Sequence, residues 1–268
     1  MRRIRTALAV AAIVLAFGVQ SAQPAEAAVP PVPYTGSVNI DYLHNGSAGG
    51  VLQRGDRYYL MTVAHIAGPL YTQHSVVKPG NYPLGGTAYN ASIGSAPEDI
   101  ALIELGTTRP SPRMRVCNAA SCPTPPGYTV AQVATIESTP TSADLPYGKI
   151  ICHSGWSSAT DSEKYGGYRC GIADNAGDYA CTQVCGMTNI NGPGTSIADG
   201  GDSGGPVWQP LPSGGIRLLG FVSNTVGPYP SQHLWYRPIW HYTTYNWTAA
   251  QSCSYCTTGP GGVVLTGS

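Results

Sequence analysis

Apolar and polar residues alternate over short stretches of this chain, and turn-forming residues separate the stretches. Residues 38–43 alternate with a period of two, while 58–63 and 216–222 are short apolar runs. Both patterns are typical of β-strands, which expose one face or bury both. The 34 Gly and 23 Pro suit many tight turns. The predicted strands are 38–43, 50–53, 58–63, 100–105, 130–136, 149–152, 167–172, 179–185, 206–208, 216–223 and 234–238.

The start of the chain has the pattern of a secretory signal peptide. Arg2, Arg3 and Arg5 precede a nearly all-apolar stretch at 7–18, and Ala-Glu-Ala ends at Ala27. The apolar stretch is shorter than the roughly 20 residues that a spanning helix needs. We therefore expect residues 1–27 to be cleaved and the mature protein to be secreted without membrane attachment. A retained anchor is the alternative.

Charge and cysteine content limit the possible functions. Only 10% of the residues are charged, the formal net charge is zero, and no basic stripe exists, so a nucleic-acid binder is not expected. Eight cysteines in an exported chain indicate disulfides. Those toward the C-terminus could pair locally or cross, and a C-x-x-C can also be redox-active or bind zinc. The expected pairs are Cys117–Cys122, Cys152–Cys170, Cys181–Cys185 and Cys253–Cys256.

Three short motifs together indicate nucleophilic catalysis. Ser203 lies between glycines in Gly-Asp-Ser-Gly-Gly-Pro, His65 ends Thr-Val-Ala-His, and Asp99 begins Asp-Ile-Ala-Leu. A serine hydroxyl is a weak nucleophile at neutral pH and needs a base, a group that orients the base, and donors for the developing oxyanion. The chain supplies residues suited to each role.

These motifs resemble those of the chymotrypsin/trypsin family, whose triad also has the order His, Asp, Ser. Cys-His-Ser-Gly from Cys152 and Tyr-Arg-Cys-Gly from Tyr168 are similar to the bacterial streptogrisin and α-lytic branch. The resemblance implies an all-β fold of two antiparallel six-stranded barrels with a short C-terminal helix in 239–250. It also implies the following organisation: leader and first barrel 28–110, linker 111–127, second barrel and helix 128–250, and a Cys- and Gly-rich tail 251–268.

The resemblance also implies roles for individual residues. Ser203 would be the nucleophile, His65 the general base and Asp99 the group that orients the base. The backbone N–H groups of Gly201 and Ser203 would form the oxyanion hole. Ser223 would flank the substrate pocket and contact the acid, and the pocket would include Ile197, Ala198, Asn224 and Thr225.

The expected function is a secreted serine endopeptidase that acts through an acyl-enzyme on a protein or peptide substrate. Ile197, at the position where trypsin-like members carry an acid, argues against a preference for Lys or Arg. No metal or organic cofactor is implied, and we expect a monomer. Two alternatives stay open: an esterase with the same triad, and a catalytically silent binding protein, because Asn224-Thr225 departs from the family's x-Gly.

Overall fold

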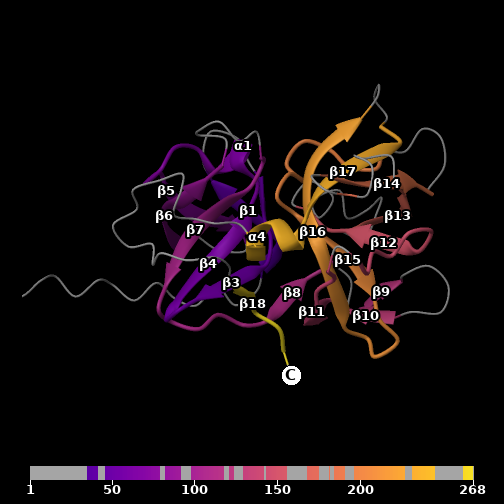
Figure 1. Cartoon of the computed structure of the whole chain (residues 1–268), viewed down its shortest axis with the longest axis horizontal. Helices are drawn as coiled ribbons and strands as arrows, with labels where there is room; N and C mark the ends of the chain where they lie inside the picture. Colours follow the sequence, from indigo (N-terminus) through magenta and orange to yellow (C-terminus); the bar gives the residue numbers. More distant parts are fainter. Residues whose placement is uncertain are drawn as a thin grey trace, which may run out of the picture.

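The structure is a computed structural model in which two β-rich lobes lie side by side (Figure 1). Its described residues are 35–41, 46–78, 82–91, 98–117, 121–123, 129–141, 143–155, 168–174, 181, 184–190, 196–226, 231–244 and 262–267. The predicted signal peptide therefore lies outside the described residues. No helix in the described ranges combines the length and the apolar character needed to cross a membrane.

The second lobe is a closed antiparallel barrel of six strands. Each strand pairs antiparallel with its neighbours, and the pairing of β15 with both β12 and β16 closes the ring. Its core includes Val207, Leu219 and Tyr236. The predicted six-stranded barrel is confirmed here. The strands, in spatial order, are β15 (Pro206–Pro210), β12 (Ile150–His153), β13 (Arg169–Asp174), β14 (Cys185–Asn189), β17 (His233–Pro238) and β16 (Ile216–Val226). Strand β14 begins at Cys185, where the predicted strand 179–185 ends.

The first lobe is a second, largely antiparallel sheet that curls back on itself. Gly49 N donates to Met61 O at 3.0 Å and Met61 N to Gly50 O at 2.8 Å, which joins the chain after β2 to β4. Four-residue α1 (Ala64–Ala67) follows β4. The strands are β1 (Thr35–Asp41), β2 (Gly46–Ala48), β3 (Val51–Arg54), β4 (Arg57–Thr62), β5 (Gln73–Lys78), β6 (Tyr82–Asn90) and β7 (Ala101–Gly106).

The predicted linker contains strands. β8 (Arg113–Arg115) pairs with β1 of the first lobe and with β11 (Val133–Ser138), and β11 pairs in turn with β16 of the second lobe. β9 (Ser121–Pro123) pairs with β10 (Thr129–Ala131). β8 lies in a proline-rich stretch and therefore has no clear strand pattern in the sequence. In the structure its Met114 is fully buried, and the neighbouring strands hydrogen-bond its backbone. One continuous hydrogen-bonded path therefore joins the lobes.

Two C-terminal segments also connect the lobes. The described helix α4 (Ile239–Thr244) lies between them (Figure 1). Its Tyr242 packs edge-on against Phe221 of β16 and donates its hydroxyl to Thr62 O of β4 at 2.8 Å. β18 (Val263–Val264) pairs with β3, and Gly267 N then reaches Ile136 O of β11 at 2.9 Å. The lobes are therefore held together near the end of β4.

Two of the predicted disulfides lie within the described residues. Cys152–Cys170 joins β12 to β13, and Cys181–Cys185 closes a short loop before β14. Cys117 is also disulfide-bonded. The side chain of its predicted partner Cys122, as well as Cys253 and Cys256, lies outside the described part of the chain.

Candidate active site

His65 is presented on a short, well-anchored helix. In α1 the side chains of Ala64, Ile66 and Ala67 are buried, whereas 46% of the His65 side chain is exposed. A four-residue helix is not stable by itself. Here the buried amide of Asn90 donates to the carbonyls of Ala64 at 3.0 Å and Gly68 at 2.7 Å, and it thereby fixes both ends of the turn.

Asp99 holds the imidazole from just before β7. Both carboxylate oxygens lie 3.0 Å from His65 Nδ1, and the His65 backbone N–H donates to Oδ1 at 3.0 Å. A carboxylate can only accept here, so Nδ1 carries the proton and Nε2 is free to act as a base. The aspartate therefore sets both the orientation and the tautomer of the ring.

Ser223 reaches the same carboxylate from the second lobe. Its hydroxyl donates to Asp99 Oδ2 at 2.6 Å. Burial raises the pKa of Asp99, but the hydrogen bonds and charge of His65, together with the Ser223 hydroxyl, outweigh burial and lower the pKa below its ordinary value. Asp99 is therefore kept as an anion beside the imidazole.

Ser203 lies on a sharp turn whose backbone requires glycine. Gly201 has φ 101° and Gly204 has φ 81°, a region that side chains with L chirality rarely adopt. A Cβ on Gly204 would also run into Thr62 Oγ1 and Ser47 O of the first lobe. The Gly204 N–H donates to Val222 O at 2.8 Å. The glycines of the motif thus allow the nucleophile turn to press directly against the opposite lobe.

Ser47 is a site residue that sequence analysis missed. From β2 its N–H donates to Ser203 O at 2.7 Å, and its hydroxyl donates to Gly201 O at 2.8 Å. These bonds fix the carbonyls on this turn. Among the described residues, the N–H groups of Gly201 and Ser203 have no intramolecular acceptor, as an oxyanion hole requires. Ser47 belongs to no motif, so its sequence carries no signal of this contact.

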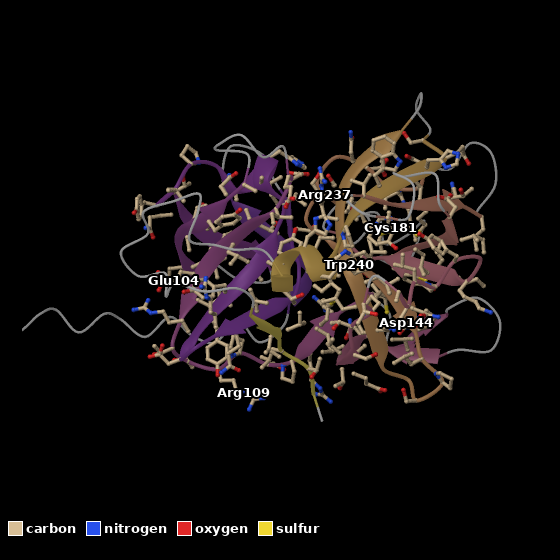
Figure 2. The ribbon with its side chains drawn as sticks, in the orientation of Figure 1. Glu104, Arg109, Asp144, Cys181, Arg237 and Trp240 are labelled. Carbon is tan, nitrogen blue, oxygen red and sulfur yellow. A yellow bond between two sulfur atoms is a disulfide. The ribbon has the colours of Figure 1, made fainter. Side chains whose placement is uncertain are left out.

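One cavity between the lobes collects most of the predicted residues. Its volume is about 540 Å³, and His65, Asp99 and Ser203 all line it. The predicted pocket residues Ala198, Ser223, Asn224 and Thr225 line it too. Further lining residues that were not predicted include Asp199, Ser231 and Arg237. Figure 2 shows Arg237 between the two lobes.

Ile197 was predicted to line the substrate pocket, and this prediction is wrong. Its side chain is fully buried in the core of the second barrel, and it is not among the residues that line the cavity. The apolar side chain gains more from the barrel core than from a solvent-filled pocket. Its backbone N–H donates to Ser231 O at 2.8 Å, and its carbonyl accepts a hydrogen bond from His153.

The two acidic residues before Ser203 are engaged within the loop. Asp199 N donates to the buried Asp202 carboxylate at 3.0 Å, and Asp202 N donates to Asp199 O at 3.1 Å. The Asp199 carboxylate pairs with Arg169 Nη2 at 2.5 Å. These contacts close the backbone turn that leads to the nucleophile, and they balance the charge of Asp199.

Asn224 changes the edge of the cavity. Its Oδ1 accepts the N–H of Thr225 at 2.8 Å, so this N–H at the edge of the cavity is already hydrogen-bonded within the chain. In the described part of the chain, no group of three or more His, Cys, Asp or Glu side chains is arranged to hold a metal ion.

Solved structures share the fold. Nocardiopsis protease aligns at 18% identity and a TM-score of 0.50, over 77% of this chain and 92% of that chain. Thermobifida fusca protease A aligns at 20% identity and a TM-score of 0.45, over 76% and 91%. An α-lytic protease homologue, N4, aligns at 13% identity and a TM-score of 0.46, over 77% and 93%. No family model matches this sequence, and no curated protein matches it.

The chain has the fold of the bacterial chymotrypsin-like serine proteases. The expected fold class is thereby confirmed. At these identities the likeness concerns the fold alone.

Proposed function

We propose that this protein is a secreted serine endopeptidase that hydrolyses peptide bonds through an acyl-enzyme. One observation carries the proposal: Asp99 holds His65 by Nδ1 at 3.0 Å, and the two share a cavity with Ser203. A carboxylate, an imidazole and a serine from two separate lobes, in one cavity on a protease fold, match the requirements of serine-nucleophile catalysis.

The reaction follows from the roles of these groups. Ser203 Oγ attacks the substrate carbonyl carbon while His65 Nε2 removes the hydroxyl proton. The tetrahedral oxyanion accepts hydrogen bonds from the N–H groups of Gly201 and Ser203. The imidazolium then gives the proton to the leaving amine, and an acyl-enzyme remains. Water, deprotonated by His65, attacks the ester, and Ser203 regains its proton as the carboxylic acid product leaves.

The charges around the cavity argue against lysine or arginine as the preferred substrate side chain. Asp199 lines the cavity next to Ala198 in the chain, and Arg169 already pairs with it. Arg237 adds a positive charge to the cavity lining. A lysine or arginine side chain of a substrate would therefore meet an acid, Asp199, that is already paired, and an arginine, Arg237, of the same charge as itself. We propose a preference for uncharged side chains of modest size.

Export is part of the proposal. The signal-peptide pattern of residues 1–27 and the Cys152–Cys170 disulfide both suit an oxidising compartment outside the cytosol.

The decisive experiment compares the chain with its Ser203→Ala variant. A fluorophosphonate should label the parent and not the variant, and turnover of a peptide library should fall on the order of 10⁶-fold. Ser213→Ala, which changes an exposed serine on a distant turn, is the matched control and should label normally. Failure of the parent to label would support a binding protein, and turnover of esters without amides would support an esterase.

A further inference from the structure

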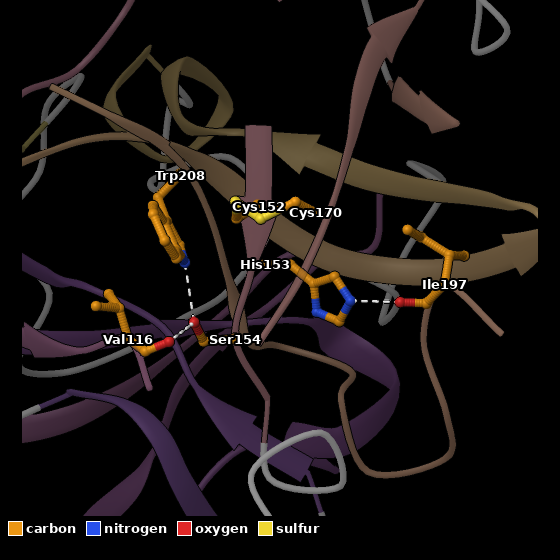
Figure 3. The surroundings of a disulfide bond; sticks show 7 residues. All are labelled: Val116, Cys152, His153, Ser154, Cys170, Ile197 and Trp208. Carbon is orange, nitrogen blue, oxygen red and sulfur yellow. Dashed lines mark hydrogen bonds between the residues drawn. A yellow bond between two sulfur atoms is a disulfide. The ribbon is translucent and has the colours of Figure 1, made fainter. Parts of the chain in front are cut away.

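A disulfide-linked hairpin lies behind the loop that leads to the nucleophile. In β12 and β13 Cys152 faces Cys170, and the next pair in the register is His153 and Arg169. Figure 3 shows the disulfide beside His153 and the adjacent Ser154. The covalent link therefore holds two basic side chains together at the end of one rigid hairpin.

His153 contacts the loop through a single short hydrogen bond. Its Nε2 lies 2.6 Å from Ile197 O, and the side chain is fully buried (Figure 3). A carbonyl can only accept, so Nε2 must carry a proton. Nδ1 is buried, and it has no hydrogen-bond partner in the part of the chain that the structure describes. The ring is thus held at one nitrogen, and that nitrogen points at the loop.

Arg169 contacts the same loop at two further places. Nη1 donates to Ser196 O at 2.8 Å, and Nη2 pairs with Asp199 Oδ2 at 2.5 Å. Only 1% of the arginine side chain is exposed. The hairpin therefore holds residues 196, 197 and 199, just ahead of Gly201 and Ser203. Because Ala198 lines the cavity, these contacts also place part of the pocket wall.

We propose that His153 and Arg169 are positioning residues that hold the 196–199 loop, so that the pocket wall at Ala198 and the oxyanion donors at Gly201 and Ser203 keep their catalytic spacing. This inference deepens the proposed function, and it rests on it. Neither residue is among those that line the cavity; His153 acts through the Ile197 carbonyl, and Arg169 acts through the Ser196 carbonyl and the Asp199 carboxylate.

The electrostatic surroundings keep the imidazole uncharged. Burial lowers the pKa of His153, and Arg169 lowers it too, while Asp202, Asp199 and the Ile197 carbonyl raise it without cancelling the effect of burial. The ring therefore stays neutral at neutral pH, with its one proton on Nε2.

The test compares two substitutions of His153 with one substitution of its neighbour Ser154. His153→Phe removes the donor and keeps a ring. His153→Gln keeps an N–H donor that can reach about the place of Nε2. Ser154→Ala is the matched control, because Ser154 follows His153 directly and is equally buried, but it donates to Val116 O at 2.6 Å instead of to the loop (Figure 3).

Two kinds of measurement are needed. The first is kcat and KM on a cleaved peptide, with each enzyme normalised to the sites that a fluorophosphonate titrates. We expect His153→Phe to lose at least tenfold in kcat/KM, with kcat falling and KM rising, and His153→Gln to recover most of the loss. Ser154→Ala should lower thermal stability and leave kcat per titrated site unchanged.

The second measurement does not depend on activity. Hydrogen exchange of the Asp199 and Asp202 amides should accelerate in His153→Phe and not in Ser154→Ala. Normal kinetics and normal exchange in a folded His153→Phe would overturn the inference. If the parent failed to react with fluorophosphonate, the proposed function would fail, while the exchange comparison would still decide whether His153 holds the loop.

Discussion

The hydrogen bond from Ser223 to Asp99 joins the two lobes at a charged, mostly buried carboxylate. Its loss should therefore lower the stability of the fold by an amount that can be estimated. Ser223→Ala removes the 2.6 Å donor while His65 remains bound to the carboxylate. A hydrogen bond to a charged group contributes about 1.5–3 kcal/mol net. The Asp99 side chain is only 17% exposed, so solvent replaces the lost donor poorly. We expect the free energy of unfolding to fall by about 2 kcal/mol at pH 7.

The sign of the pH dependence follows from the lowered pKa of Asp99. A depressed pKa stabilises the fold above the unfolded value of about 3.9, and that stabilisation is lost as the pH falls through the lower folded value. Ser223→Ala raises the folded pKa, because one donor to the anion is gone. The deficit should therefore be full at pH 7 and shrink only as the pH falls below about 3.9 and through the lowered folded pKa, where the native carboxyl also becomes protonated.

Urea unfolding at pH 7 and at pH 2.5 measures this difference, in a Ser203→Ala background that prevents self-digestion. Ser213→Ala is the matched control, since it removes a serine-to-carboxylate bond, to Glu137, that is exposed. Its cost should stay within about 0.5 kcal/mol. An equal deficit for Ser223→Ala at both pH values, or one no larger than that of the control, would refute the reasoning.

Three further predictions concern the site and its frame. Asp99→Asn should lower kcat about 10⁴-fold with little change in KM, because an amide favours the wrong imidazole tautomer. Steady-state kinetics checks this, and a near-normal kcat would contradict it. Ser47→Ala should lower the free energy of unfolding by about 1–3 kcal/mol, since the Gly201 carbonyl loses a partly buried donor. It should also lower kcat in steady-state assays of the folded enzyme, and a change in KM alone would argue against this role. Replacing Cys152 by alanine should cost about 3 kcal/mol in a denaturant titration, because the disulfide closes a loop across 18 positions, whereas an unchanged midpoint would exclude that contribution.

Much of the fold and of the candidate triad could be predicted from the sequence, because those features depend on neighbouring residues. The alternation of apolar residues predicted a β protein, and the second barrel closes as six antiparallel strands. The glycines around Ser203 are required by a positive φ at Gly201 and Gly204, which is a local constraint and leaves a local signal. Motif order then indicated which histidine and which aspartate would accompany the serine.

Other features depended on partners far away along the chain. Ser47 and Gly201 are 154 positions apart, and neither lies in a pattern that names the other. Proline-rich β8 becomes a strand because β1 and β11 satisfy its backbone on both sides. Ile197 has an apolar side chain that would suit a pocket or a core, and the packing of the second barrel placed it in the core.

The sequence by itself therefore determined the strand pattern, the glycine-dependent turn and the candidate triad, since backbone sterics and side-chain chemistry act within a few residues. Only the tertiary structure decided which carbonyls the nucleophile turn binds, which side of the 196–199 loop faces the cavity, and which basic groups hold that loop. Those outcomes depend on how two lobes dock, and docking is set by the summed packing of segments that share no local pattern.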